Sequence, residues 1–431
     1  MEAGLSTQAV IAVVIFVATY AFIVAEKVHR SVVALAGAAV AVFSGIITQD
    51  QAVAAIDFNT IGLLVGMMII VGVTRETGIF EALAVYAARV ARGEPVRILI
   101  YLSFITAFLS ALLDNVTAVF LIVPVTFAVT RKLQVTPTPY LISEIIASNI
   151  GGTGTLIGDP PNIMISGPAD LQFNDFLANT APIAFVCFMA ALAFLYLVYR
   201  RRLRTEPELK QQLLELRPRD YIRNVPLLVR SMTVLGLTIA GFLLHGVLHI
   251  PTASIALGGA TLLLLITDLE TEKAFHNVEW PTLFFFTGLF VLVGALEATG
   301  LMELAARAVL DVTEGRLLLT GLGILWVSAL ASGFVDNIPF VAAMIPLLQE
   351  MGRLGGIDDL RPLWWSLSLG ACLGGNGTLV GAAANVIVAG LAERHGTRLT
   401  FARYFKVGFP VMLITIALST VYLIIFHLRP L

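Results

Sequence analysis

Two aspartate–asparagine pairs, Asp114-Asn115 and Asp336-Asn337, stand inside long apolar stretches of the sequence. A carboxylate in such surroundings is costly to desolvate and is usually retained for a function. It can hold Na⁺ through its oxygen atoms, or it can take up a proton, because burial favours its neutral form. The alternative is that each aspartate only caps the helix that follows it, although Asn or Ser would cap without a charge. We therefore predict ion or proton binding at Asp114 and Asp336.

The second polar feature is a pair of glycine-rich segments, Gly151–Asn162 (GGTGTLIGDPPN) and Gly374–Asn385 (GGNGTLVGAAAN). Glycine and proline break a helix, and a broken helix at membrane depth is tolerated where it lines a cavity or lies inside protein. Small residues could instead serve only close helix packing, but breaks and polar groups occur together twice. The predicted binding residues are Asn115, Thr117, Asn337, Gly152, Thr153, Gly154, Thr155, Asp159, Asn162, Gly375, Asn376, Gly377, Thr378 and Asn385.

Asp159 has no acidic counterpart in the second glycine-rich segment, where Ala382 or Ala383 takes its place. This asymmetry indicates a role in proton coupling in the first half only, together with Asp114 and Asp336; a plain loop-capping role stays open. Glu144 precedes the first glycine-rich segment and either lines the same cavity or lies near a helix end.

These motifs belong to an internal repeat. Ser110–Asn115 (SALLDN) matches Ser332–Asn337 (SGFVDN), and Pro124 matches Pro346 at the same separation in sequence. The glycine-rich segments match as well, with the separation shifted by a single position. A nearly constant separation over most of each half predicts a duplicated structural unit.

The composition indicates a membrane protein. Hydrophobic residues make up 58% of the chain and charged residues 13%, with a mean hydropathy of +0.90, whereas soluble domains carry about 25% charged residues. Apolar stretches able to cross a hydrocarbon core of about 30 Å recur along the chain. The first one lacks a basic leader and a cleavage site, so we expect it to be a retained helix. These stretches are 9–25, 31–47, 61–73, 182–199, 231–248, 252–266, 282–296 and 407–426.

The basic residues predict the orientation. With both termini outside, 22 of the 27 Lys and Arg residues fall in cytoplasmic segments, as the positive-inside rule requires of an inner-membrane protein. Segments 26–30 and 268–279 are among those placed at the cytoplasmic surface, and no Lys or Arg is expected at mid-membrane depth. The polar stretch 200–230 is expected to be a cytoplasmic linker, with a regulatory or lipid-binding helix as the alternative.

Each half is predicted to contain full helices, a re-entrant hairpin with the Asp-Asn pair at its tip, and a broken helix. A hairpin adds no net crossing, so each half crosses five times and the second copy is inverted. The expected all-α arrangement comprises a first repeat at 1–200 (hairpin about 98–130, broken helix about 138–166), a linker at 201–230, and a second repeat at 231–431 (hairpin about 317–350, broken helix about 363–391).

Other classes of function find little support. There is no nucleotide-binding motif ending in Gly-Lys-Ser/Thr and no nucleophile–base arrangement, so neither ATP-driven transport within the chain nor an enzyme is expected. The two cysteines lie in separate apolar stretches and the histidines lie near segment ends, so no metal site is expected. We expect no cofactor beyond H⁺ or Na⁺ as the coupling ion, and no nucleic acid as a partner.

The two glycine-rich segments and the paired Asp-Asn motifs resemble those of the ion transporter superfamily. Within it they are most similar to the arsenite permease (ArsB) branch, which includes NhaD-type sodium/proton antiporters and the mammalian P protein. The resemblance covers essentially the whole chain. It implies a scaffold domain, a transport domain holding both hairpins and both broken helices, elevator-like movement and a homodimer; an accessory ATPase stays open.

The resemblance also bears on the substrate. The dicarboxylate branch carries Ser-Asn-Thr at its hairpin tips, where this chain has Asp114–Thr117 (DNVT) and Asp336–Pro339 (DNIP). Added carboxylates repel a di- or tricarboxylate and fit a cation or a neutral solute such as As(OH)₃ or Sb(OH)₃. The leading hypothesis is proton-coupled efflux of arsenite and antimonite. The alternatives are Na⁺/H⁺ antiport and symport of a carboxylate or another oxyanion.

Overall fold

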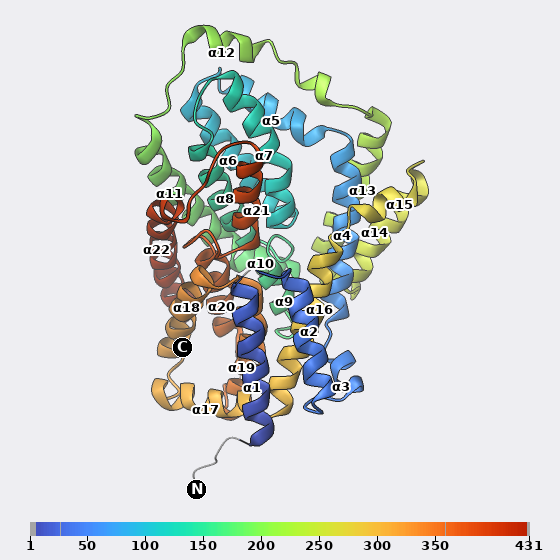
Figure 1. Cartoon of the computed structure of the whole chain (residues 1–431), viewed down its shortest axis with the longest axis vertical. Helices are drawn as coiled ribbons and strands as arrows, with labels where there is room; N and C mark the ends of the chain where they lie inside the picture. Colours follow the sequence, from blue (N-terminus) through green and yellow to red (C-terminus); the bar gives the residue numbers. More distant parts are fainter. Residues whose placement is uncertain (1–5, 26, 358, 429–431) are drawn as a thin grey trace.

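The computed structural model describes residues 6–25, 27–357 and 359–428. In these ranges the regular structure is helical throughout, without a strand, and eight helices are long and apolar enough to cross a membrane (Figure 1). The predicted all-α polytopic fold is confirmed. Arg429, one of the 27 basic residues, and Glu26, the first residue of segment 26–30, lie outside the described residues, as do both chain ends. The orientation therefore stays a prediction.

The first half of the chain forms eleven α-helices. They are α1 (Thr7–Val24), α2 (Arg30–Phe43), α3 (Gln49–Ala54), α4 (Phe58–Glu76), α5 (Ile79–Val90), α6 (Pro95–Leu112), α7 (Asn115–Lys132), α8 (Thr138–Thr153), α9 (Pro160–Ser166), α10 (Phe173–Asn179) and α11 (Ala181–Tyr199). The polar linker follows, with α12 (Pro207–Leu214) and the short 3₁₀ helix η1 (Pro218–Tyr221).

The second half repeats this order. Its helices are α13 (Val225–Leu248), α14 (Thr252–Ile266), α15 (Thr271–His276), α16 (Trp280–Ala298), α17 (Leu301–Thr313), α18 (Leu317–Phe334), α19 (Asn337–Gly355), α20 (Arg361–Gly374), α21 (Ala383–Arg394) and α22 (Phe401–Phe426). Helices α2 to α7 precede α14 to α19 by the separation of the Asp-Asn motifs, and α8 and α9 precede α20 and α21 by that of the glycine-rich segments. The spacing found in the motifs therefore holds for whole helices.

The two halves of the chain pack against each other through equivalent helices. Helix α4 packs along α14, and its counterpart α16 packs along α2. Both crossings are close because a glycine faces the other helix: a Cβ atom on Gly66 would lie 2.4 Å from the carbonyl carbon of Ala256, and one on Gly288 would lie 2.6 Å from that of Ala34. Small residues let helix backbones approach in this way. The repeated Gly and Ala positions thus fix how the halves join.

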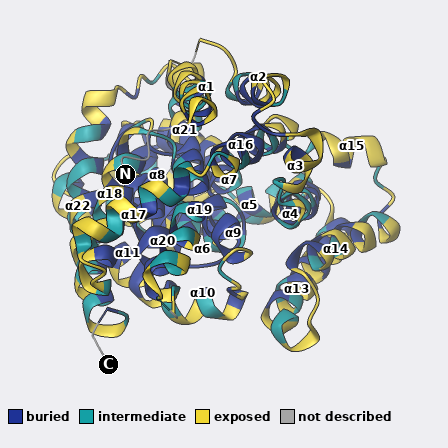
Figure 2. Ribbon diagram, turned by 90° about the horizontal axis from the view of Figure 1, so that it is seen from below, coloured by how far each residue is buried: buried dark blue, intermediate teal, exposed yellow. Residues whose placement is uncertain are grey.

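The hairpins and broken helices form a compact group. In each half the first hairpin arm packs along the first part of the broken helix, as α6 on α8 and α18 on α20, and the two halves meet through α8–α20 and α9–α19. Figure 2 shows α13 and α14 at one side of the molecule, away from this group. The arms α6, α7 and α18 each span 18 residues and α19 spans 19.

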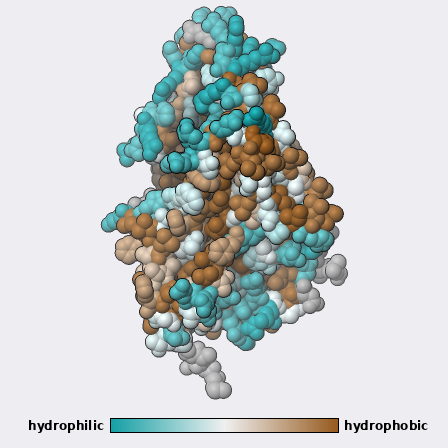
Figure 3. All heavy atoms as spheres, turned by 90° about the vertical axis from the view of Figure 1, so that its right-hand side faces the viewer, coloured by the Kyte–Doolittle hydropathy of each residue, from teal (hydrophilic) through white to brown (hydrophobic). Residues whose placement is uncertain are grey.

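The surface has the pattern of a membrane protein. In Figure 3 hydrophobic side chains gather over the middle of the visible face, and hydrophilic side chains cover the end that carries the linker. Large apolar side chains such as Phe43, Val247 and Leu265 are exposed. Their exposure is accounted for if the surrounding solvent is hydrocarbon.

Candidate functional site

The two aspartates lie in the turns of the hairpins, where each caps the second arm. The carboxylate of Asp114 accepts hydrogen bonds from the backbone N–H of Thr117, at 2.8 Å, and from its hydroxyl. The carboxylate of Asp336 accepts from the N–H of Ile338 at 3.1 Å. Capping therefore occurs at both tips, while the same two side chains also line cavities.

Asp159 joins the two hairpin tips. Its carboxylate is fully buried, and its Oδ1 atom accepts hydrogen bonds from the side-chain amides of Asn115, at 3.2 Å, and Asn337, at 3.3 Å. The Asp159 side chain makes no capping hydrogen bond to α9. The structure therefore does not support the alternative that Asp159 only caps a loop. The acid found in only one repeat thus lies between the asparagines found in both.

Asn162 and Asn385 hold the two unwound segments in shape. The Nδ2 atom of Asn162 donates to the carbonyls of Thr153 and Thr155, and that of Asn385 donates to the carbonyls of Gly375 and Thr378. These carbonyls would otherwise lack partners where the helix breaks. The amide nitrogens of both asparagines are therefore engaged in hydrogen bonds within the protein.

The broken helices are also linked to each other. Asn149 donates to the side-chain oxygens of Asn376, at 3.1 Å, and Asn385, at 3.0 Å. Its counterpart in the second repeat is Cys372, whose thiol lies 3.6 Å from Oδ1 of Asn162. Asn149 was not among the predicted residues, because the repeat was traced through like residues and its partner there is a cysteine.

The remaining loop residues are buried behind the cavities. The hydroxyls of Thr153 and Thr155 donate to backbone carbonyls, and the hydroxyl of Thr378 accepts from Val380 N–H. Gly152 allows close backbone contact, since a Cβ there would lie 2.4 Å from the carbonyl oxygen of Gly158. Of the predicted residues, those that line a described cavity are Asp114, Asn115, Thr117, Asp159, Asp336 and Asn337; those behind are Gly152, Thr153, Gly154, Thr155, Asn162, Gly375, Asn376, Gly377, Thr378 and Asn385.

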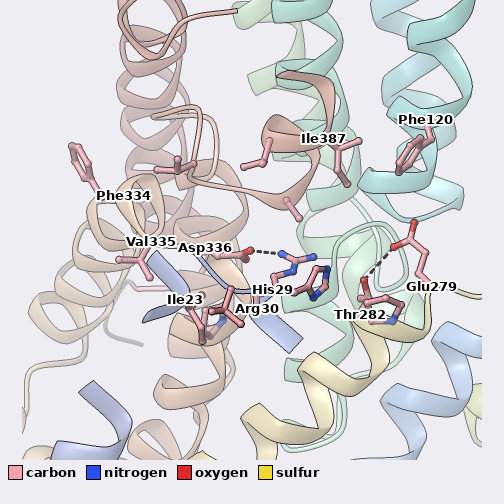
Figure 4. A pocket seen from close by; sticks show the side chains of 16 residues that line it. Ile23, His29, Arg30, Phe120, Glu279, Thr282, Phe334, Val335, Asp336 and Ile387 are labelled. Carbon is pink, nitrogen blue, oxygen red and sulfur yellow. Dashed lines mark hydrogen bonds and ion pairs between the residues drawn. The ribbon is translucent and has the colours of Figure 1, made fainter. Parts of the chain in front are cut away.

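Two cavities meet at the tips. The smaller has a volume of about 20 Å³, and its polar lining includes Asp114, Asp159 and Glu279. The larger has a volume of about 600 Å³ with a mainly apolar lining that includes Phe120, Pro339 and Ile387 (Figure 4). A space of about 10–15 Å³ is enough for one water molecule. The smaller cavity therefore has the size of an ion or one water, and the larger has room for a solute.

Arg30 and Glu279 belong to the site although the charge pattern placed them at the cytoplasmic surface. Arg30 lines both cavities, and its Nη1 atom forms an ion pair of 2.8 Å with Oδ2 of Asp336 (Figure 4). The charge count did not predict this contact, and the depth of Arg30 in the membrane stays a prediction. An opposite charge at hydrogen-bonding distance offsets the cost of burying the guanidinium.

The repeat would have revealed Glu279. Glu279 precedes α16 and lies 3.2 Å from the hydroxyl of Thr282, which donates to it (Figure 4). At the equivalent place in the first repeat, Asp57 precedes α4 and accepts from the hydroxyl of Thr60 at 2.5 Å. An acid with a threonine three positions later thus recurs at both helix starts. The counterpart of Arg30 is Thr252, so the guanidinium has no equivalent in the other half.

Glu144 and the two cysteines lie away from the cavities at the hairpin tips. Glu144 is fully buried on α8, where it accepts from the hydroxyl of Thr126, and its other oxygen has no partner in the described part of the chain. The thiols of Cys187 and Cys372 are buried on α11 and α20. Within the described residues, no group of His, Cys, Asp or Glu side chains is arranged to hold a metal ion.

Inverted repeats with facing broken helices and ionisable groups between hairpin tips define a membrane transporter of the secondary class. The chain belongs to the citrate transporter family (CitMHS), whose sequence profile matches residues 20–370. It is 44% identical over 421 residues to uncharacterized transporters of Mycobacterium tuberculosis and Mycobacterium bovis, covering 96% of this chain and 98% of theirs.

A more distant relative is the P protein. The chain is 37% identical to the P protein of Sus scrofa over 510 residues, covering 99% of this chain and 60% of the P protein. Among solved structures, the YdaH transporter of Alcanivorax borkumensis, described as having an unusual topology, has a TM-score of 0.58 at 14% identity, covering 99% of this chain and all of that one. At that identity the likeness supports the fold alone.

Proposed function

We propose that this protein is a proton-coupled secondary transporter whose coupling centre is the acidic cluster between the hairpin tips. The observation that carries the proposal is the convergence of Asp114, Asp159 and Glu279 on a cavity of about 20 Å³. Like charges this close in a poorly hydrated site disfavour full ionisation. Binding a proton relieves the repulsion, and alternate exposure of the cluster to the two sides of the membrane would couple that proton to a solute.

Efflux of arsenite and antimonite is the leading assignment for the solute. As(OH)₃ and Sb(OH)₃ are neutral and present three hydroxyl donors, which suit carboxylate and amide oxygens. The cavity of about 600 Å³ beside the acidic cluster has room for such a solute. The thiols of Cys187 and Cys372 are buried on separate helices, so oxygen atoms rather than thiolates would hold it. The assignment also draws on the resemblance to the arsenite permease branch, which includes the P protein, and the chain is 37% identical to the P protein of Sus scrofa.

Na⁺/H⁺ antiport is the second candidate, and a separate observation favours it. The small cavity is ion-sized and is bordered by the carboxylates of Asp114 and Asp159 and by the amide groups of Asn115 and Asn337. Oxygen atoms are the ligands that hard cations prefer. A Na⁺ ion and a proton would then compete for the same carboxylates, which is the simplest way to exchange one for the other.

Symport of a carboxylate or another oxyanion is the third candidate, because citrate is named in the family description. Arg30 is the guanidinium that an anion would need, but it is already paired with Asp336. A free tricarboxylate would also meet Asp114 and Glu279, and like charges a few ångströms apart repel strongly. This candidate therefore ranks below a neutral solute or a cation.

Elevator-like movement fits the way the elements are joined. Asp159 bonds to both hairpin tips, and Asn149 bonds the first broken helix to the second. Hairpins and broken helices would accordingly move as one body, the transport domain. The helices α2, α4, α14 and α16, paired across the repeat, would form the scaffold. A homodimer built through such a scaffold stays a prediction.

Growth of a bacterial strain that lacks its own arsenite and sodium exporters tests the substrate. We expect the native protein to restore growth on arsenite and antimonite, and everted membrane vesicles to accumulate arsenite until a protonophore is added. Growth restored only at high sodium would favour the second candidate. Citrate accumulation without either effect would favour the third. Solute flux unaffected by a protonophore would contradict proton coupling.

A further inference from the structure

The two hairpin tips carry the same acid but face different charges. At the second tip, the carboxylate of Asp336 is bound by the guanidinium of Arg30 at 2.8 Å, and the two side chains are only 15% and 27% exposed. Arg30 also lies over the ring of Phe285, 5.0 Å from its centre. An ion pair that is shielded from water and held by a ring is stronger than one at the surface.

The first tip has no such partner. The carboxylate of Asp114 is bonded by Thr117, and it forms no ion pair with a Lys, Arg or His side chain in the described part of the chain. Thr252, which occupies the position of Arg30 in the other half, accepts a hydrogen bond from Asn59 at 3.2 Å instead. In the repeat, a neutral residue thus occupies the sequence position that corresponds to Arg30.

Asp114 also faces further acids. Glu279 and Asp159 line the small cavity with it, and Arg30 lies on the same cavity while engaged with Asp336. Arg75 and Glu279 border a third cavity, of about 50 Å³, next to Thr117. The ionisable groups nearest the second tip are Arg30, His29 and Tyr20, with Asp159 bonded to the neighbouring Asn337 and Glu279 across the larger cavity. Both tips therefore have acids nearby, but only Asp336 has a cation bound to its carboxylate.

We propose that Asp114, beside Glu279, carries the coupling proton, whereas Arg30 holds Asp336 as a permanent anion and so assigns different roles to the two aspartates of the repeat. This inference rests on the proposed function. A proton from the more acidic side binds a carboxylate oxygen of Asp114, forming a carboxylic acid, and leaves from the same oxygen on the other side. Asp336 stays ionised throughout, because protonating it would leave Arg30 without a counter-charge.

Proton movement in liposomes tests the assignment. The protein is reconstituted with a pH-sensitive dye inside, an arsenite gradient or a Na⁺ gradient is applied, and protons moved per solute are measured together with solute exchange at equal pH. The variants are Asp114→Asn, Asp336→Asn, Arg30→Thr and the double variant Arg30→Thr with Asp336→Asn. Thr is chosen because it is the residue at position 252. Arg316→Thr, which removes an exposed arginine paired with Glu314, is the control.

We expect Asp114→Asn to lose solute-driven proton movement but to keep solute exchange. Asp336→Asn slows transport because Arg30 is left unpaired, and the double variant recovers part of the rate with an unchanged proton-to-solute ratio. Arg30→Thr alone frees Asp336 to titrate, so that the ratio rises or a second step appears in its pH profile. Arg316→Thr should match the native protein.

The outcomes distinguish the proposed function from the proton assignment. Native protein that moves solute without protons would overturn both. Native protein that is proton-coupled, together with an Asp114→Asn variant that keeps its coupling, would overturn the assignment alone. A double variant that folds and exchanges solute but no longer moves protons would also overturn it, since Asp336 would then be a proton carrier. Solute exchange serves as the check on folding in each variant.

Discussion

The amide nitrogen of Asn337 lies 3.3 Å from Oδ1 of Asp159, which joins the tip of the second hairpin to the first broken helix. Asn115 of the other tip donates to the same atom. One carboxylate therefore gathers two residues that the repeat placed in opposite halves of the chain. Binding of a cation or a proton to the Asp159 carboxylate would therefore affect its hydrogen bonds to both hairpin tips at once.

Replacing Asp159 by Ala should destabilise the protein and stop transport. Two buried amides would lose their acceptor, and leaving a buried donor unsatisfied costs about 1–3 kcal/mol. Thermal unfolding in detergent would measure the loss. Asp170→Asn is the matched control, since Asp170 is exposed beyond α9 and its removal should leave unfolding unchanged. Equal stability of Asp159→Ala and native protein would contradict the bridging role.

Asn162→Ala and Asn385→Ala should have similar effects, because each asparagine holds two carbonyls of its own unwound segment. We expect a loss of about 1–3 kcal/mol in each, from the carbonyls left without a donor. Unfolding of the purified variants measures it, with the exposed Asn174→Ala as a comparison. A variant that unfolds like the native protein would show that its segment does not need this bond.

Gly158→Ala should prevent proper folding. The added Cβ would lie 2.5 Å from the carbonyl oxygen of Ser110 and 2.7 Å from the Cα of Gly152, and neither backbone atom can move away easily. Gly236→Ala in α13 is the control, because no atom lies within 4 Å of its added Cβ. Removing a glycine from a helix interior there should stabilise by about 0.5–1 kcal/mol. Yield and thermal unfolding of both variants provide the comparison, and normal yield of Gly158→Ala would be inconsistent with the close packing described.

Glu144→Gln should fold and transport normally. The carboxylate of Glu144, on α8, accepts a hydrogen bond from the hydroxyl of Thr126, on α7. Glu144 lines none of the three cavities at the hairpin tips. An amide keeps the acceptor for Thr126, and it removes a buried ionisable group whose second oxygen lacks a partner among the described residues. Proton-to-solute ratios of Glu144→Gln and native protein in liposomes would be compared. A lower ratio would place Glu144 on the proton path and extend the coupling centre along α8.

A cysteine-free variant, Cys187→Ala with Cys372→Ser, should still transport arsenite if that is the solute. The two thiols are buried on different helices, and Cys187 faces the carbonyl of Thr415 at 3.5 Å. Arsenite uptake into everted vesicles measures the effect. Uptake abolished in a variant that still unfolds normally would mean that thiol ligation contributes, contrary to oxygen-only binding.

The repeated motifs predicted much of the architecture. Like residues recur at a constant separation in the two halves, and whole helices recur at the same separation. The glycine and proline content of 151–162 predicted where the first broken helix is interrupted. The equivalent positions of Gly66 and Gly288 belong to the same repeat. Pairing between α4 and α14 could not be predicted in this way, because it depends on which faces meet in three dimensions.

The composition of the site was harder to predict. Counting charges assigns Lys and Arg to one side of the membrane, and it therefore gave no sign that Arg30 pairs with Asp336. Glu279 was missed because the repeat was traced through identical residues, and its counterpart Asp57 is a different acid. Asn149 was hidden because its counterpart is Cys372. For Arg30 and Asn149 the missing information was a contact between residues distant in sequence.

If the acidic cluster between the hairpin tips moves a proton whenever solute crosses the membrane, that movement should be visible as an electrical signal. The measurement is charge movement by the purified native protein on a solid-supported membrane, after a jump in arsenite or in Na⁺ concentration. We expect a transient current that depends on pH and that disappears in Asp114→Asn. A current of the same size at every pH, unchanged by that substitution, would contradict proton coupling at this cluster.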